Sequence, residues 1–88
     1  MDGDDAQIAW PVMPKHAPVM GSDGSQIGIT EELLGDKDED IFHGLVIRRD
    51  DGEAVEIPAP RVKRMTARQV ITDLDAKEAE HLQPYRGR

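Results

Sequence analysis

The residues best suited to hold a metal ion lie between positions 36 and 40, where an oxygen-rich loop could bind a hard cation such as calcium. Its four carboxylates are Asp36, Asp38, Glu39 and Asp40. Read as a calcium-binding loop that starts at Asp36, the segment needs glycine at its sixth position and glutamate at its twelfth, but Ile41 and Ile47 stand there. The pattern fails, and we expect a solvated loop that keeps a neighbouring strand edge from pairing.

Histidine and serine occur without a pattern that catalysis or metal binding requires. The histidines are His16, His43 and His81, and their separations of 27 and 38 residues match no local metal-binding pattern. Ser22 and Ser25 flank the Asp23-Gly24 turn, which accounts for them, and neither lies in a Gly-x-Ser-x-Gly elbow. The chain has no cysteine, which excludes disulfides, thiolate metal sites and a cysteine nucleophile. We therefore predict no catalytic residue, no metal site and no cofactor.

Basic residues gather late in the chain. Residues 1–60 carry 4 basic and 14 acidic groups, whereas residues 61–88 carry 7 basic and 4 acidic groups. The first basic residues of the later part are Arg61, Lys63, Arg64 and Arg68. Strand alternation would place Lys63 on one face and Arg61 on the other, which spreads positive charge along one sheet edge. Such residues either guard the edge against aggregation or bind an acidic partner, such as the acidic loop of another copy.

Two Asp-Gly pairs, Asp23-Gly24 and Asp51-Gly52, predict the hairpins that position these residues, because Asp-Gly supplies the positive φ angles that a hairpin turn needs. Apolar alternation predicts strands over 17–20, 27–30 with an apolar run continuing to 35, 41–49, 54–57, 62–65 and 69–74. Gly44, inside the strongest of these strands, predicts a bulge or bend. Six short strands in so few residues favour an all-β, antiparallel, curled or closed small barrel.

The two ends of the chain are expected to lie outside this barrel. Residues 1–9 are polar and acidic, and nothing in them offsets the entropy of ordering, so we expect a disordered tail. Asp75 and Glu78 have the spacing of a capping box and predict a short helix that stops near Gln83, before Pro84. The expected division is a tail over 1–9, a barrel over 10–74, and a short helix and tail over 75–88.

Composition limits the classes of function. The 88 residues suffice for one domain with a modest core, and only Trp10, Phe42 and Tyr85 are aromatic, so an aromatic-lined ligand pocket is not expected. No apolar run approaches the roughly 20 residues that cross a bilayer, and the acidic start is unlike a secretion signal. We therefore expect a cytoplasmic protein. The net charge of −7 disfavours non-specific attraction to nucleic acid or to an anionic membrane surface.

The order of these features resembles the PRC-barrel family, named for the cytoplasmic domain of the photosynthetic reaction-centre H subunit, which also includes the C-terminal domain of the ribosome maturation factor RimM. The likeness spans residues 12–74. It rests on Val19-x-x-x-Asp23-Gly24-x-x-Ile27-Gly28, then Ile41 to Ile47, then Asp51-Gly52 and Ile57-Pro58-Ala59-Pro60-Arg61-Val62. The resemblance implies a six-stranded barrel that acts as a docking or regulatory module, with no shared catalytic residues. This chain would be a small free-standing member with low aromatic content.

We therefore expect a non-enzymatic protein-interaction module that associates with itself or with a protein partner. Its candidate interaction residues are Trp10, Arg61, Lys63, Arg64 and Arg68. Trp10 either anchors an interface, where tryptophan is enriched, or covers an open end of the barrel. An alternative is an RNA-processing or ribosome-assembly accessory protein, by analogy with the ribosome maturation factor, although no aromatic residue for base stacking lies among the basic ones. A small hydrolase or isomerase would need paired titratable groups in a pocket, and the spacing identifies none.

Overall fold

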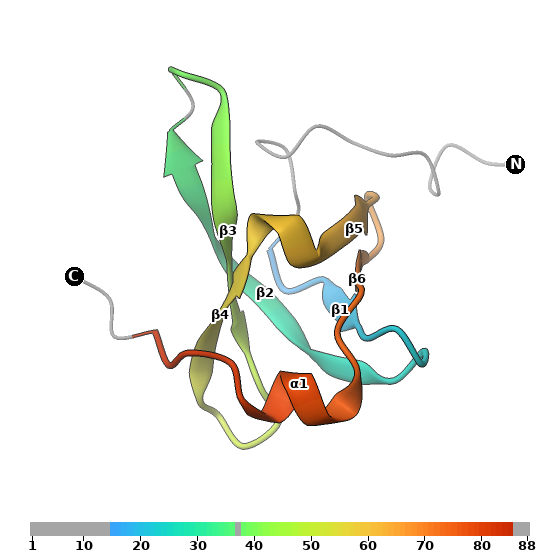
Figure 1. Ribbon diagram of the computed structural model, residues 1–88. Helices are drawn as coiled ribbons and strands as arrows, with labels where there is room; N and C mark the ends of the chain where they lie inside the picture. The colour runs from blue at the N-terminus through green and yellow to red at the C-terminus, as the bar shows by residue number, and fades with distance from the viewer. Residues whose placement is uncertain (1–14, 37, 86–88) are drawn as a thin grey trace, which may run out of the picture.

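The fold is all-β with one short helix, as expected (Figure 1). The computed structural model describes residues 15–36 and 38–85, so the expected tail over residues 1–9 and the candidate Trp10 lie outside the described residues. The strands are β1 (Pro18–Met20), β2 (Gln26–Asp36), β3 (Ile41–Arg48), β4 (Ala54–Pro58), β5 (Val62–Met65) and β6 (Val70–Thr72). A 3-10 turn, η3 (Ala59–Arg61), precedes β5, and helix α1 (Ala76–Glu80) follows β6.

The six strands form one sheet in the order β4-β3-β2-β1-β6-β5. Every neighbouring pair is antiparallel except β1 and β6, which run parallel with Val19 opposite Val70. The expectation of a wholly antiparallel sheet is therefore wrong at this pair. Parallel neighbours cannot be joined by a tight turn and need a long crossover connection, and here the chain from β2 through β5 provides it.

The sheet curls because its two end strands are consecutive in the chain. β4 and β5 lie at opposite ends of the strand order, yet only the three residues of η3 join them. Pro58 and Pro60 have no amide hydrogen, which ends the β4 ladder at this point. Within residues 15–36 and 38–85 no strand ladder joins β4 to β5, so the curled sheet is not closed by backbone hydrogen bonds there.

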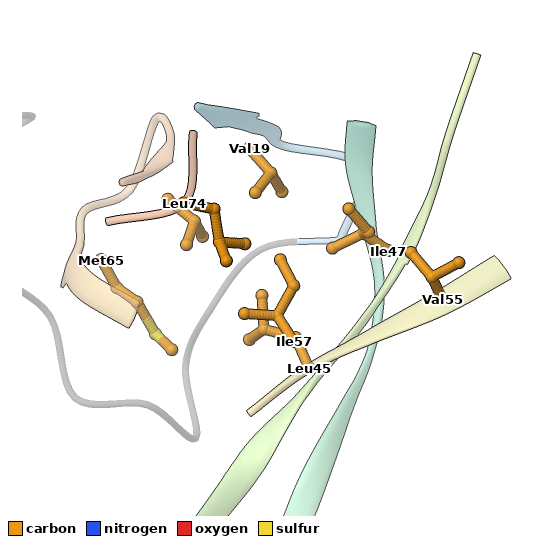
Figure 2. Packing of buried hydrophobic residues seen from close by; sticks show 8 residues of the cluster. Val19, Leu45, Ile47, Val55, Ile57, Met65 and Leu74 are labelled. Atoms are coloured by element: carbon orange, nitrogen blue, oxygen red, sulfur yellow. The ribbon is translucent and has the colours of Figure 1, made fainter. Parts of the chain in front are cut away.

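The core lies inside this curl and is built from aliphatic side chains and methionine (Figure 2). Its buried members are Val19, Leu45, Ile47, Val55, Ile57, Met65, Val70 and Leu74. The register brings side chains of three strands together, because Leu45 of β3 lies opposite Leu33 of β2 and Ile57 of β4. Thr72 is also buried, and its hydroxyl donates to the Met20 carbonyl at 2.9 Å. Each buried side-chain nitrogen or oxygen in the described residues has a hydrogen-bond partner.

The two Asp-Gly turns, residues 21–25 and 49–53, share one hydrogen-bond pattern. In each, the amide of the first residue donates to the carbonyl of the fifth, and the amide of the fourth donates to the carbonyl of the first, over 2.8 to 3.1 Å. The glycines, Gly24 and Gly52, have φ angles of 87° and 88°. The carboxylate of the aspartate that precedes each glycine accepts a hydrogen bond from the amide of the residue that follows the glycine, at 3.0 and 2.9 Å. Both predicted turns are confirmed as hairpin loops with a left-handed glycine.

The outer halves of β2 and β3 form a two-stranded hairpin, residues 32–36 and 38–43, which we call the arm. β1 pairs with β2 no further than Ile29, and β4 pairs with β3 no further than Gly44. The arm therefore projects beyond the other strands (Figure 1). Gly44 has a φ of 154° and the β2–β3 register shifts between Leu34 and Gly35, so the expected bend is confirmed at the base of the arm. Asp36 belongs to β2 rather than to the predicted loop.

The predicted capping box begins helix α1. The Asp75 carboxylate accepts the Glu78 amide at 2.7 Å, and the Glu78 carboxylate accepts the Asp75 amide at 3.1 Å. Ala79 is buried, and Leu82 packs against the core.

The segment after α1 covers the outer edge of β4. The Glu56 amide donates to the Gln83 carbonyl and the Tyr85 amide donates to the Ala54 carbonyl, each at 2.9 Å. Pro84 lies opposite Val55, so the segment adds a short antiparallel bridge to the sheet. This end of the sheet order is thereby protected, and the residues that sequence reasoning singled out lie at the other end, on and beside β5.

Candidate functional site

Three basic side chains at the β5 end of the sheet form what we call the basic surface: Lys63, Arg64 and Arg68. All three residues are exposed. The β5–β6 register shifts between Val62 and Arg64, and this bulge places two consecutive basic residues outward instead of one on each face.

Thr66 positions Arg68, the third member of the basic surface. This threonine is buried, and its hydroxyl oxygen accepts the amides of Arg68 and Gln69, each at 3.2 Å. The Thr66 amide in turn donates to the Gln69 carbonyl at 2.9 Å. Strand β5 and the turn after it therefore hold the three cations on a firmly bonded hairpin.

Arg61 has a different setting from the other predicted candidates. It lies in η3 rather than in a strand, because the prolines before it end β4. Its Nε lies 2.5 Å from an Asp73 oxygen and its Nη2 lies 2.9 Å from a Glu78 oxygen. These hydrogen bonds, the Asp73 bond first, raise the pKa of Arg61. The guanidinium thus ties η3 to the end of β6 and to α1, and its charge is matched within the chain.

The partners of Arg61 were missed by reasoning from the sequence, although a signal was present. The β5–β6 hairpin places Val62 opposite Thr72, so the preceding Arg61 lies opposite Asp73. The Asp73 amide donates to the Arg61 carbonyl at 3.0 Å, which continues this register. Two opposite charges placed symmetrically about the predicted 66–68 turn would have identified the pair.

The tip of the arm carries the acidic residues. The carboxylates of this acidic tip, all on exposed residues, are Asp36, Asp38, Glu39 and Asp40. The Asp36 carboxylate accepts the backbone amides of Asp38 at 3.0 Å and Glu39 at 3.3 Å, which organises the turn. No group of three or more candidate metal ligands occurs among the residues that the structure describes.

Apolar side chains on the arm divide into inward and outward ones. Leu33 and Phe42 pack against the core. Ile41, next to the acidic tip, is 44% exposed and is the exposed large hydrophobic residue of the described chain. In the body of the sheet, Arg48 Nε lies 2.8 Å from a Glu31 oxygen across β2 and β3, and this bond lowers the pKa of Glu31. The arm thus presents Ile41 next to the acidic tip.

An open hollow of about 310 Å³ lies between the two Asp-Gly turns and α1, lined by residues 25–27, 49–51 and part of the helix. Arg49 reaches across it, and its Nη1 donates to the Ala79 carbonyl at 3.1 Å. Ser25 Oγ donates to Asp23 at 2.7 Å, and the bonds from Ser25 lower the pKa of Asp23. Ser25 and Asp23 thus stabilise the turn that borders the hollow.

The three histidines lie on separate parts of the surface. His16 is exposed ahead of β1 with a φ of 61°, and His43 is exposed on the arm. His81 follows α1, where its Nδ1 lies 2.8 Å from the Lys77 carbonyl. All three residues are exposed.

Comparison with known proteins gives no relative, because neither a family model nor a curated protein matches the chain. The resemblance to the PRC-barrel family therefore stays a prediction. Within residues 15–36 and 38–85, α1 is far too short to cross a bilayer and no other helix is long and apolar enough to do so.

Proposed function

We propose that the chain is a non-enzymatic protein-interaction module of the PRC-barrel type that associates with copies of itself through the basic surface. The observation that carries this proposal is the separation of charge. Lys63, Arg64 and Arg68 supply three positive charges, whereas residues 36–40 carry a net charge of −3 with Lys37 included. Figure 1 shows the tip of the arm lying apart from β5. Opposite charges of equal size on separate parts of one molecule favour contact between two molecules, and they set the register of that contact.

In this proposal Arg61 is a structural residue and not a docking residue, because it is only partly exposed and its guanidinium bonds Asp73 and Glu78. Its role is to hold η3 and α1 in place. The docking residues are the three exposed cations of the basic surface, with Lys63 at the bulge of β5. For Trp10, which lies outside the described residues, both predicted roles stay open: an apolar anchor at an interface or a cover over an open end of the barrel.

Sedimentation velocity over a range of protein and salt concentrations tests the proposal. We expect the mean mass to rise above the 9.8 kDa of the monomer as protein concentration increases, and to fall back as salt screens the charges over a Debye length of about 10 Å at 0.1 M. Lys77→Gln removes an exposed positive charge from α1 and, as a control, should leave the association unchanged. A protein that remains monomeric at millimolar concentration in low salt would overturn the proposal.

The same sample separates this function from binding of RNA. If the three cations neutralised RNA phosphates, the affinity for a single-stranded oligonucleotide would fall with salt with a logarithmic slope of about −2. We expect no saturable binding of such an oligonucleotide. Saturable binding with that slope, in a protein that stays monomeric, would favour the accessory role in RNA processing instead.

A further inference from the structure

We infer that the acidic tip of the arm of one copy docks on the basic surface of a second copy, so that each molecule both provides an arm and receives one. The inference rests on the proposed function and identifies the surface that occupies the basic one. Its occupant is a second copy because the same chain carries both complementary surfaces.

The position of the arm suits this contact. Its two strands extend past the rest of the sheet, since β1 and β4 leave β2 and β3 unaccompanied beyond Ile29 and Gly44. The end of the arm, β2 beyond Leu34 and β3 before Gly44, has no third strand beside it, and contact with a partner would stabilise it. Figure 1 shows the arm projecting from the rest of the strands, which leaves its end accessible to a neighbouring molecule.

The chemistry of the tip matches the basic surface in charge and adds apolar area. The Asp36 carboxylate is used by the backbone of the turn, whereas the side chains of Asp38 and Glu39 extend from that turn and are exposed. Ile41 lies next to them and is 44% exposed. Carboxylates would steer the tip to the cations, and burial of Ile41 would add affinity at the centre of the contact.

The contact joins two different surfaces, and this gives a charge-exchange experiment. One variant carries Lys63→Glu and Arg64→Glu, so that both its tip and its docking surface are acidic. The other carries Asp38→Lys and Glu39→Lys, so that both are basic. Each variant alone should associate at least about tenfold more weakly than the unmodified chain, because like charges then face one another. An equimolar mixture should recover the association, since each arm then meets a surface of opposite charge.

Matched controls separate the location of the charges from their number. Asp50→Lys with Glu53→Lys makes the same change in charge as Asp38→Lys with Glu39→Lys, but at the β3–β4 turn, where both residues are exposed. These substitutions should leave the association within about twofold. Ile41→Ser should weaken it about three- to tenfold, in proportion to the exposed part of the side chain that becomes buried. Circular dichroism of every variant would establish that the fold is retained.

The outcomes distinguish this inference from the proposed function. If the unmodified chain associates and the charge variants associate equally well, the arm contact is wrong and the proposed function stands. If each variant loses association but the mixture does not recover it, the occupant of the basic surface is something other than the arm. If the unmodified chain does not associate at all, the proposed function fails and the arm contact fails with it. A mixture that recovers association supports both.

Discussion

Replacing Gly44 by alanine should strongly destabilise the protein, because two separate costs meet at this residue. Its φ of 154° lies in a region that residues with a side chain rarely adopt, and such a conformation costs about 1–3 kcal/mol. A Cβ at this position would also lie only 2.3 Å from the Ile57 carbonyl oxygen. Forcing β3 and β4 apart to relieve that overlap costs about another 1–3 kcal/mol. We therefore expect Gly44→Ala to lower the free energy of unfolding by about 2–6 kcal/mol.

This loss is large against the total stability, which is about 4–13 kcal/mol for a chain of 88 residues. At the middle of the range, about 4 kcal/mol, the melting temperature should fall by roughly 15–30 °C. Urea unfolding followed by far-UV circular dichroism, with thermal melts, measures both quantities.

Other glycines in the chain separate the two costs. Gly24 and Gly52 have positive φ angles but nothing within 4 Å of an added Cβ, so alanine there should cost about 1–2 kcal/mol. Gly28 has no positive φ, but its Cβ would lie 2.6 Å from the Arg48 carbonyl oxygen, so alanine there should carry only the steric cost, about 1–3 kcal/mol. If Gly44→Ala proves no worse than Gly24→Ala, the close approach of β4 at the base of the arm is wrong.

Two further predictions concern the helix cap and an ion pair. Asp75→Ala should lower the free energy of unfolding by about 1 kcal/mol, because the Glu78 amide loses its acceptor. Asp75→Ser should lower it much less, because serine can also accept this amide. Equal losses in the two variants would contradict the capping role. Arg48 holds the pKa of Glu31 below its ordinary value of 4.5, so the stability from this pair is complete above that value and is lost as the pH falls through the lowered pKa. Arg48→Gln should raise the Glu31 pKa in an NMR titration, and an unchanged pKa would refute the assignment.

The strands and turns were predictable because each follows from local chemistry. The Asp-Gly pairs identified both hairpin loops, and the position of Gly44 predicted the bend. The capping box was readable because Asp75 and Glu78 have fixed spacing and the residue types that the motif needs. Information about a turn or a cap is contained within a few neighbouring residues, so these features did not depend on the rest of the fold.

Pairings between distant parts of the chain were harder to predict from the sequence. The parallel contact of β1 with β6 depends on how the whole chain between them folds, and no local pattern encodes it. The placement of Arg61 failed for a related reason, since the alternation predicted for the strand over 62–65 was extended back by one residue into what is a 3-10 turn. The basic surface was identified, but the bulge that turns both Lys63 and Arg64 outward is a property of the β5–β6 register.

The parallel pairing of β1 with β6 also sets the order in which this chain can fold. The Thr72 hydroxyl reaches the Met20 carbonyl across 52 residues of sequence, whereas β1 to β4 are joined by neighbouring hairpins. Those hairpins can form before β6 docks, and until β6 docks one side of β1 lacks its partner strand. Closing such a long loop costs entropy before the contact returns any stability, so docking of β6 is expected to limit the folding rate.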